Sequence, residues 1–315
     1  MKVKLIGKQI REKLLLLIII NLITIQYFFS FAAAQETVEK RVVVAVIDTG
    51  IDYNSEELCD FRWTNEEEIP KDGLDNDKNG YIDDKNGWNF YGGNNRVYNS
   101  ANTYDDHGTH CAGIIIANTN ATNIKIMSLK VLGGAGSTGK ISDVIRAIQY
   151  AEKMGADICN MSLGAELDNP KLKKVIKQSK MLFITAAGNN IMGADLDTKG
   201  IYPAVYQLSN LISVANCLED GTLNPTSNYG RTTVTLASSG TNIYSTLTGG
   251  RAGILTGTSM AAARVTGIAA SLYGTNILLK ASEAKNKIIQ MVEKKDELEN
   301  VLITSGILQT VREEK

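Results

Sequence analysis

The chain lacks an excess of either charge. Its 33 Lys and Arg residues nearly balance 34 Asp and Glu residues, giving a formal net charge of −1 over 315 residues. A balanced chain has no general electrostatic attraction to nucleic acid or to an anionic membrane surface. The densest basic run, residues 171–180, fits the solvated face of a helix whose Leu172, Val175 and Ile176 point inward. Function must therefore come from local groups of residues.

Cysteine and histidine are also scarce, and their spacing excludes the common zinc patterns. Only two histidines occur, His107 and His110, and no HExxH pattern or third nearby ligand accompanies them. The four cysteines are widely spaced without a CxxC pair, at Cys59, Cys111, Cys159 and Cys217. The last three lie in small or apolar runs typical of buried thiols. Whether any two of the four form a disulfide stays open.

Residues 1–34 resemble a secretory signal and are set aside from the fold. Basic residues precede an uncharged apolar stretch at 14–34, which ends in three alanines before Gln35. At about 20 residues the stretch could span a bilayer uncleaved, so a membrane anchor is the alternative to a cleaved signal. Either way we predict an exported body. We expect a short lead-in at 35–41, one domain at 42–310 and a polar tail at 311–315, without internal repeats.

The body alternates strand-like and helix-like patterns. An unbroken β-branched run at 41–47 is typical of a strand buried on both faces of a parallel sheet. Further strand-like runs lie at 123–131, 155–163, 181–185, 211–215, 232–237 and 241–247. Helical patterns lie at 142–154, where Ser142 and Asp143 are expected to cap the helix, at 168–180 and near 281–299. This rhythm predicts an α/β fold with a central, mostly parallel sheet flanked by helices.

A serine follows a glycine turn at the start of an apolar helix. Residues 257–263 read Gly-Thr-Ser-Met-Ala-Ala-Ala, and the small or apolar pattern continues to Leu272 with only Arg264 charged. Ser259 would thus lie near free backbone N–H groups and the positive end of the helix dipole, which favour an oxyanion. Capping of the helix is the alternative role for Ser259, and in isolation it is the commoner one.

Two other polar segments stand at positions suited to catalysis. Asp48 follows the first buried strand, at the edge where open α/β sheets place their sites, although a turn-forming role fits it equally. His107 and His110 follow a polar turn at the head of an apolar helix. One histidine can act as a general base, and the second is expected to face the core or a backbone carbonyl.

An acidic stretch rich in Asn and Gly occupies residues 66–89. Residues 75–83 match the start of a calcium loop, with oxygen ligands at alternate positions and a sharp glycine turn. The expected ligands are Asp75, Asp77, Asn79, Tyr81 and Asp83. Asn86 stands where an EF-hand has a bidentate Glu, and no flanking helix pair is evident. We therefore expect a calcium-binding insertion with a structural role, and a plain turn cluster is the alternative.

Three segments, residues 48–50, 107–110 and 257–262, together resemble the signature segments of the subtilisin-like serine proteases. The resemblance covers roughly residues 42–308, and the order Asp, His, Ser along the chain is that of subtilisin. It implies a subtilisin-like three-layer fold and a serine endopeptidase that hydrolyses peptide bonds of extended polypeptides through an acyl-enzyme. No cofactor is expected for the reaction itself.

The resemblance also implies a role for individual residues. His107 takes the proton from Ser259 as it attacks, and Asp48 holds and stabilises the imidazole. Asn189 supplies the side-chain donor of the oxyanion hole. The expected walls of the substrate cleft are Gly136, Ser137, Ser162, Leu163 and Gly164. Asp106 either favours a basic substrate residue near the cut or caps the following helix, and both readings stay open.

Several departures from the family pattern bear on regulation more than on chemistry. Alanine stands at Ala263, where proline is usual, and Ala-Ser-Ser-Gly replaces Ala-Pro-Gly at 237–240. Residues 118–126 are shorter than the familiar calcium loop of the family. Only residues 35–41 precede the first strand, so no pro-segment fits there and a separate pro-segment or inhibitor is an expected partner. We expect a monomer without nucleic-acid partners, and a catalytically silent calcium-dependent binding protein is the rival function.

Overall fold

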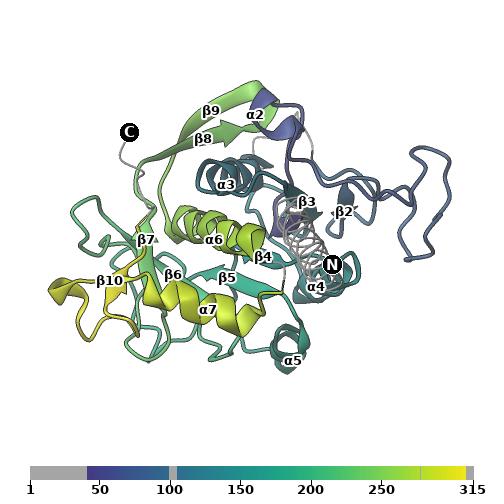
Figure 1. Ribbon diagram of the computed structural model, residues 1–315. Helices are drawn as coiled ribbons and strands as arrows, with labels where there is room; N and C mark the ends of the chain where they lie inside the picture. Colours follow the sequence, from purple (N-terminus) through teal and green to yellow (C-terminus); the bar gives the residue numbers. More distant parts are fainter. Residues whose placement is uncertain (1–40, 99–104, 277, 310–315) are drawn as a thin grey trace, which may run out of the picture. The chain divides into compact units, whose positions relative to one another are not determined.

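A nine-stranded sheet organises the part of the chain that the structure, a computed structural model, describes: residues 41–98, 105–276 and 278–309 (Figure 1). The strand order is β10-β11-β7-β6-β5-β4-β1-β3-β2, and all neighbours pair in parallel except β10 and β11. The strands are β1 (Val42–Asp48), β2 (Gly87–Asn89), β3 (Ile124–Lys130), β4 (Ile158–Met161), β5 (Leu182–Ala186), β6 (Leu211–Cys217), β7 (Leu236–Ser239), β10 (Glu293–Lys294) and β11 (Gly306–Ile307). The predicted α/β class with a mostly parallel sheet is confirmed.

Strand β1 shows why its sequence is an unbroken apolar run. All of its residues are buried, and it lies between β3 and β4 in the middle of the sheet. Val42, Val44 and Val46 join one hydrophobic core. The alternate residues Val43, Ala45 and Ile47 join the core on the opposite face. Because both faces are covered, the run has no polar alternation until it ends at Asp48.

Helices cover both faces of the sheet, which gives three layers (Figure 1). They are α2 (Glu56–Cys59), α3 (Asp106–Ala117), α4 (Ile141–Lys153), α5 (Pro170–Gln178), α6 (Thr258–Thr275) and α7 (Ala281–Gln290). Buried residues of α3, α6 and α7 share one core, and those of α4 and α5 share the other. Helix α6 is buried along most of its length, and its first turns are largely alanine. Small side chains let this helix lie close to the sheet.

A two-stranded ribbon lies outside the main sheet. Strands β8 (Ile243–Leu247) and β9 (Arg251–Leu255) pair antiparallel and are joined by the 3₁₀ turn Thr248–Gly250. Sequence patterning predicted the first strand but not the second. The ribbon contacts α3, since Ser245 Oγ donates a hydrogen bond of 2.9 Å to the carbonyl of His110. The ribbon then leads directly into the glycine turn before α6.

Two predicted helix boundaries were wrong. Helix α7 ends at Gln290 rather than near Glu299, because Glu293 and Lys294 pair with β11 at the sheet edge. Helix α4 begins at Ile141 with Lys140 in the cap position, and neither Ser142 nor Asp143 caps it. In α7 a contact distant in sequence overrode the local helix propensity. In α4 the helix begins one residue earlier than predicted, a difference typical of helix ends.

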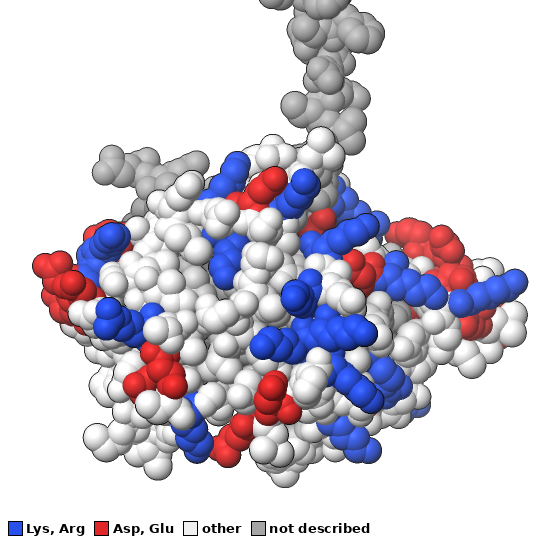
Figure 2. All heavy atoms as spheres, turned by 90° about the horizontal axis from the view of Figure 1, so that it is seen from below, with Lys and Arg blue, Asp and Glu red and all other residues white. Residues whose placement is uncertain are grey.

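The lysine-rich run forms the solvated face of α5, as predicted. Leu172 and Ile176 are buried on the inner face, and the lysines of the helix are exposed. Figure 2 shows one face of the molecule, on which Lys and Arg side chains are interrupted by Asp, Glu and uncharged residues. No charge of a single sign is continuous across that face.

Chain contacts separate residues 1–39 from residues 40–315, and the latter form one compact unit. The predicted export signal at 14–34 lies outside the described residues. Within the described part, none of the helices is both long and apolar enough to cross a membrane. All four cysteines are unpaired thiols, with Cys59 exposed and the other three buried as expected.

Candidate active site

The carboxyl ends of the central strands bring the candidate catalytic residues to one edge of the sheet. Asp48 is the last residue of β1 and is fully buried. His107 lies in the first turn of α3, and Ser259 lies in the first turn of α6. Open α/β sheets place ligands at this edge, where strand ends and helix starts converge.

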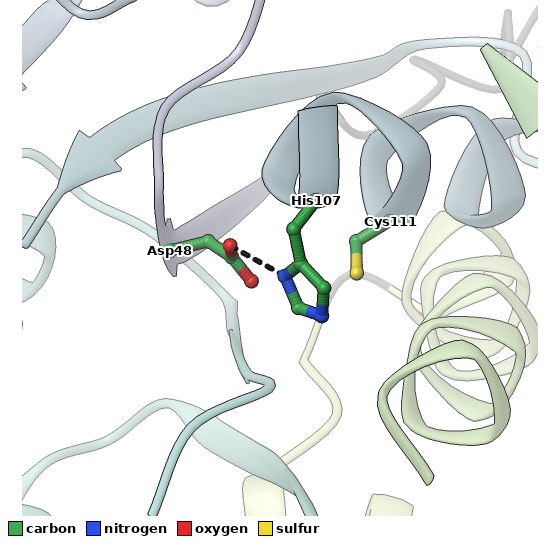
Figure 3. Close-up of side chains that lie close together, drawn as sticks. All are labelled: Asp48, His107 and Cys111. Atoms are coloured by element: carbon green, nitrogen blue, oxygen red, sulfur yellow. Dashed lines mark hydrogen bonds and ion pairs between the residues drawn. The ribbon is translucent and has the colours of Figure 1, made fainter. Parts of the chain in front are cut away.

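Asp48 and His107 are in direct contact (Figure 3). The Asp48 Oδ1 atom lies 2.7 Å from His107 Nδ1 and also accepts a hydrogen bond of 2.7 Å from the Thr49 N–H. Gly108 permits this approach, because a Cβ there would lie 2.3 Å from the Gly50 carbonyl oxygen. With Nδ1 engaged by the carboxylate, the Nε2 atom of His107 is left for a third group. The His107 side chain is 32% exposed.

The protonation of His107 is set by two opposing effects. Burial favours the neutral ring, but the negative charge of Asp48 and its hydrogen bond outweigh burial and raise the pKa of His107 above its ordinary value. The Asp48 Oδ2 atom is buried and has no hydrogen-bond partner among the described residues. The carboxylate is therefore committed to the histidine and the adjacent backbone.

A short path of contacts joins this pair to the start of α6. Cys111 lies one turn after His107 on α3. Its sulfur, a carboxylate oxygen of Asp48 and a ring nitrogen of His107 all lie within 4.8 Å of one another (Figure 3). The same sulfur lies 3.8 Å from Ser162 Oγ, which donates a 3.2 Å hydrogen bond to the carbonyl of Ser259. Helical spacing of four residues from His107 was the signal that could have placed Cys111 here.

Asn189 lies against the glycine turn before Ser259. Its Oδ1 accepts a hydrogen bond of 3.1 Å from the Thr258 N–H, and Thr258 Oγ1 in turn accepts one of 3.0 Å from the Gly188 N–H. A Cβ on Gly257 would lie 3.2 Å from Asn189 Nδ2, so the side chain of Asn189 packs closely against this turn. Because the amide oxygen accepts this bond, the Asn189 NH₂ group is left as a donor beside the start of the helix.

His110 has a different environment from His107. Its ring is fully buried, and Nε2 lies 3.1 Å from the Ile243 carbonyl and 3.2 Å from the Gly253 carbonyl. Two carbonyl neighbours require Nε2 to carry the proton. Burial lowers the pKa of His110, against partial compensation by these hydrogen bonds. The second histidine thus faces backbone carbonyls, as expected, and fastens the β8–β9 ribbon to α3.

The predicted cleft-wall residues lie in two segments. Gly136 and Ser137 belong to an exposed turn closed by hydrogen bonds of 3.0 and 3.1 Å between Gly133 and Thr138. Beyond Ser162, the backbone of Ala165 pairs with that of Tyr202. The remaining wall residues are Leu163 and Gly164. Leu163 is partly buried against a hydrophobic core, and a Cβ added at Gly164 would lie 2.6 Å from the Ile201 side chain.

Asp106 neither caps α3 nor stays a free charge. Arg251 donates to its two oxygens at 2.7 and 2.8 Å, and the Thr248 N–H donates at 3.0 Å. The helix cap position belongs to Asp105, whose side chain makes no capping bond. The Arg251 ion pair neutralises Asp106, and this 145-residue separation gave no sequence signal.

The acidic loop gathers a different carboxylate set from the one its motif predicted. Oxygens of Glu68, Asp77 and Asp84 lie within 4.8 Å of one another. Glu68 Oε1 accepts hydrogen bonds of 2.8 and 3.3 Å from the N–H groups of Asn76 and Asp77. Glu68 Oε2 is buried and has no hydrogen-bond partner among the described residues. Burial raises the pKa of Asp84, which shows the cost of charge in this cluster.

The other motif residues serve the shape of the loop. Asp75 accepts hydrogen bonds from the N–H groups of Asn79 and Gly80, at 2.9 and 2.8 Å. Asp83 accepts bonds of 3.2 Å from the backbone of the 72–73 turn. Asn79 donates its amide to Asp77 and Asp84, and the Tyr81 ring packs in an aromatic group with Trp88, Phe90 and Tyr150. Glu68 and Asp84 were missed because they lie outside the motif register.

Comparison with known proteins supports one family. Residues 39–304 match the model of the Subtilase family. The chain is 34% identical over 238 residues to the Major intracellular serine protease of Bacillus subtilis (strain 168), covering 72% of this chain and 67% of that protein. It is 32% identical over 280 residues to Subtilisin-like protease 1 of Plasmodium falciparum (isolate 3D7), covering 79% of this chain but only 39% of that protein.

A solved structure supports the fold. The crystal structure of a cold adapted subtilisin-like serine proteinase matches with a TM-score of 0.67 at 24% identity, covering 86% of this chain and 89% of that one. At this identity the likeness concerns the architecture. It agrees with the parallel sheet and flanking helices described above.

Proposed function

The chain belongs to the subtilase family and is a serine-type endopeptidase, and we propose that Asp48, His107 and Ser259 carry out its chemistry. The observation that carries this assignment is the 2.7 Å contact between Asp48 and His107 at the head of α3, beside the start of α6. A catalytically silent family member would not need the contact between Asp48 and His107 for its function. The rival role of a binding protein therefore has less support.

The proposed reaction is acyl transfer to the serine. Ser259 Oγ attacks the carbonyl carbon of the peptide bond while His107 Nε2 takes its proton. Asp48 stabilises the imidazolium that forms, consistent with the raised pKa of His107. The ring then protonates the departing amine, and a water molecule, activated in the same way, releases the acyl group. Asn189 Nδ2 and the backbone N–H of Ser259 would hold the oxyanion.

We propose that the substrate is an extended polypeptide lying between the two predicted wall segments. Main-chain hydrogen bonds to Gly136 and Gly164 would add it as a further strand, which tolerates many sequences. We also propose that the body acts after export, on the strength of the apolar stretch at 14–34. N-terminal sequencing of the mature protein distinguishes a cleaved signal, which predicts a start at Gln35, from an anchor, which predicts an intact N-terminus.

We propose in addition that the acidic loop holds a structural calcium ion. Glu68, Asp77 and Asp84 offer carboxylate oxygens, the ligands that calcium prefers. The buried Glu68 Oε2 without a partner is the observation that supports an ion rather than a turn cluster. An ion here would neutralise carboxylates that otherwise repel each other, and it would take no part in the reaction.

The direct test compares the full chain with its Ser259→Ala variant on an unfolded protein substrate. We expect the variant to lose about 10⁶-fold in kcat, the loss known for the nucleophile of subtilisin itself. Labelling by a fluorophosphonate should disappear in parallel. Equal hydrolysis by parent and variant would contradict the assignment of Ser259. A parent that folds but neither cuts nor labels would favour the binding-protein rival.

A further inference from the structure

The acidic residues just before His107 are both neutralised by cations distant in sequence. Lys130 Nζ lies 2.7 Å from Asp105 Oδ1, and both side chains are almost fully buried. Arg251 forms the two-point contact with Asp106 described above. Neither carboxylate therefore presents a free negative charge to a substrate. The net charge that a substrate meets near His107 therefore depends on charged groups that have no ion-pair partner.

A cavity of about 360 Å³ opens beside the Asp105–Lys130 pair. Asp105 and Lys130 line its inner part, and the backbone of Gly133 links it to the turn that carries Gly136 and Ser137. The Tyr91 ring packs against Gly133, where a Cβ would come within 2.6 Å of the ring. The cavity therefore lies between the histidine-bearing helix start and one predicted wall of the substrate cleft.

One cation in the cavity lining is free to meet a ligand. The Lys130 ammonium is saturated, because it also donates to the carbonyls of Thr49 and Leu132. Arg96 lies on the cavity lining and is exposed. Across the described ranges its guanidinium makes no ion pair, and only its backbone N–H is engaged, by Asn94. The remaining polar character comes from the asparagine and tyrosine side chains of the lining.

We propose that this cavity accepts an acidic side chain of the substrate near the cleaved bond and that Arg96 selects it. The inference rests on the proposed endopeptidase function and adds a substrate class to it. A planar guanidinium matches a carboxylate in two-point geometry, and the aromatic walls suit the aliphatic stem of Glu. The neutralised Asp105 and Asp106 remove the repulsion that such a side chain would otherwise meet.

Solvent limits the size of the effect. Because Arg96 is exposed, a single pair with a substrate carboxylate should change kcat/KM by about threefold to fivefold. The preference should shrink as salt is raised from low to high concentration, since the pair is screened. A preference that came from shape alone would not depend on salt.

The test uses internally quenched peptides with Glu, Gln or Lys placed in turn at the three positions on either side of the cut. The full-length parent should favour Glu over Lys at one position. Arg96→Gln should remove that preference, and Arg96→Glu should reverse it. Arg231→Gln, at another exposed arginine, is the matched control and should leave the profile unchanged. Arg251→Gln, which frees Asp106, should weaken the preference for Glu without altering the cavity.

The outcomes separate this inference from the function on which it rests. Hydrolysis with no Glu preference, or with the same profile in Arg96→Glu as in the Arg231→Gln control, would overturn the acidic subsite and leave the endopeptidase intact. A parent that cleaves none of the peptides, nor an unfolded protein, would instead overturn the proposed function itself.

Discussion

The catalytic edge, where Asp48, His107 and Ser259 lie at the carboxyl ends of the strands, differs from the acidic loop in how its buried charges are compensated. At the edge, two buried carboxylates meet a cationic or protonatable partner from a remote segment, in the pairs of Asp48 with His107 and Asp105 with Lys130. In the loop, Glu68, Asp77 and Asp84 carry the same sign and lie within 4.8 Å of one another. Their hydrogen bonds come mostly from neighbours within twenty residues along the chain.

The contrast indicates what each region needs from outside the chain. Unlike charges partly compensate each other when they are buried together, so the catalytic edge carries less uncompensated charge than the loop. Like charges in a buried cluster stay unfavourable until a cation neutralises them or protons are taken up. The catalytic edge should therefore fail through its chemistry, and the loop should fail through its stability.

Asp48→Asn should have the largest effect at the catalytic edge after Ser259→Ala. The amide cannot hold the productive tautomer of His107, and we expect kcat to fall about 10⁴-fold, as with the corresponding change in a chymotrypsin-like triad. Only the neutral ring accepts a proton, so the raised pKa of His107 places the acidic limb of kcat/KM at higher pH. Removing the carboxylate lowers that pKa, and the limb should move to lower pH. A limb that stays in place would exclude His107 as the titrating base.

Asn189→Ala should separate chemistry from stability at the same edge. Loss of this donor should reduce kcat by about 10²–10³-fold with little change in KM, the loss known for the corresponding donor of subtilisin. Since Asn189 is exposed, Tm should stay near that of the parent. Steady-state kinetics and thermal melting on the same preparation check both parts. A large fall in Tm with unchanged kcat would make Asn189 a purely structural residue.

Chelation should have the smaller, opposite signature in the acidic loop. An ion bound only by the folded state stabilises it by about 2.7 kcal/mol at a hundredfold excess over Kd, so a chelator should lower Tm while initial rates stay the same. Glu68→Gln should abolish the response to calcium. Without calcium it should be at least as stable as the parent, because one repelling charge is gone.

The matched control for the loop is Glu67→Gln. It removes one negative charge, as Glu68→Gln does, but from an exposed neighbouring residue. It should keep the calcium response of the parent. If the parent melts at the same temperature with and without chelator, the loop is a turn cluster and the comparison between the two regions no longer holds.

Sequence patterning predicted most of the fold because the main elements have strong local signals. The β-branched run before Asp48 became the central strand β1, and the spacing of apolar residues predicted α4 and α5. Strand β9 was missed because it is short, contains Gly253 and is largely exposed. It therefore lacks the apolar pattern of a strand with a buried face. Helix α7 was extended too far because pairing with β11 is a tertiary contact.

The candidate site divides along the same line. Asp48, His107 and Ser259 stand at predictable ends of strands and helices, and the structure gathers those ends at one edge. The Arg251 partner of Asp106 and the Glu68 partner of the motif carboxylates depend on how loops fold back, which no local pattern encodes. What sequence can state is which elements end where, and what it misses is which loop side chains meet there.

The order of the elements along the chain also determines when, during synthesis, the protein can become proteolytically active. Asp48 is the last residue of the first strand, and the serine helix α6 follows β7, β8 and β9 along the chain. A chain emerging from the ribosome therefore cannot assemble a cutting centre until almost the whole domain has been made. Extended parallel sheets also fold slowly, because distant segments must find each other first. The architecture thus acts as a delay, and a prematurely ended chain would be harmless.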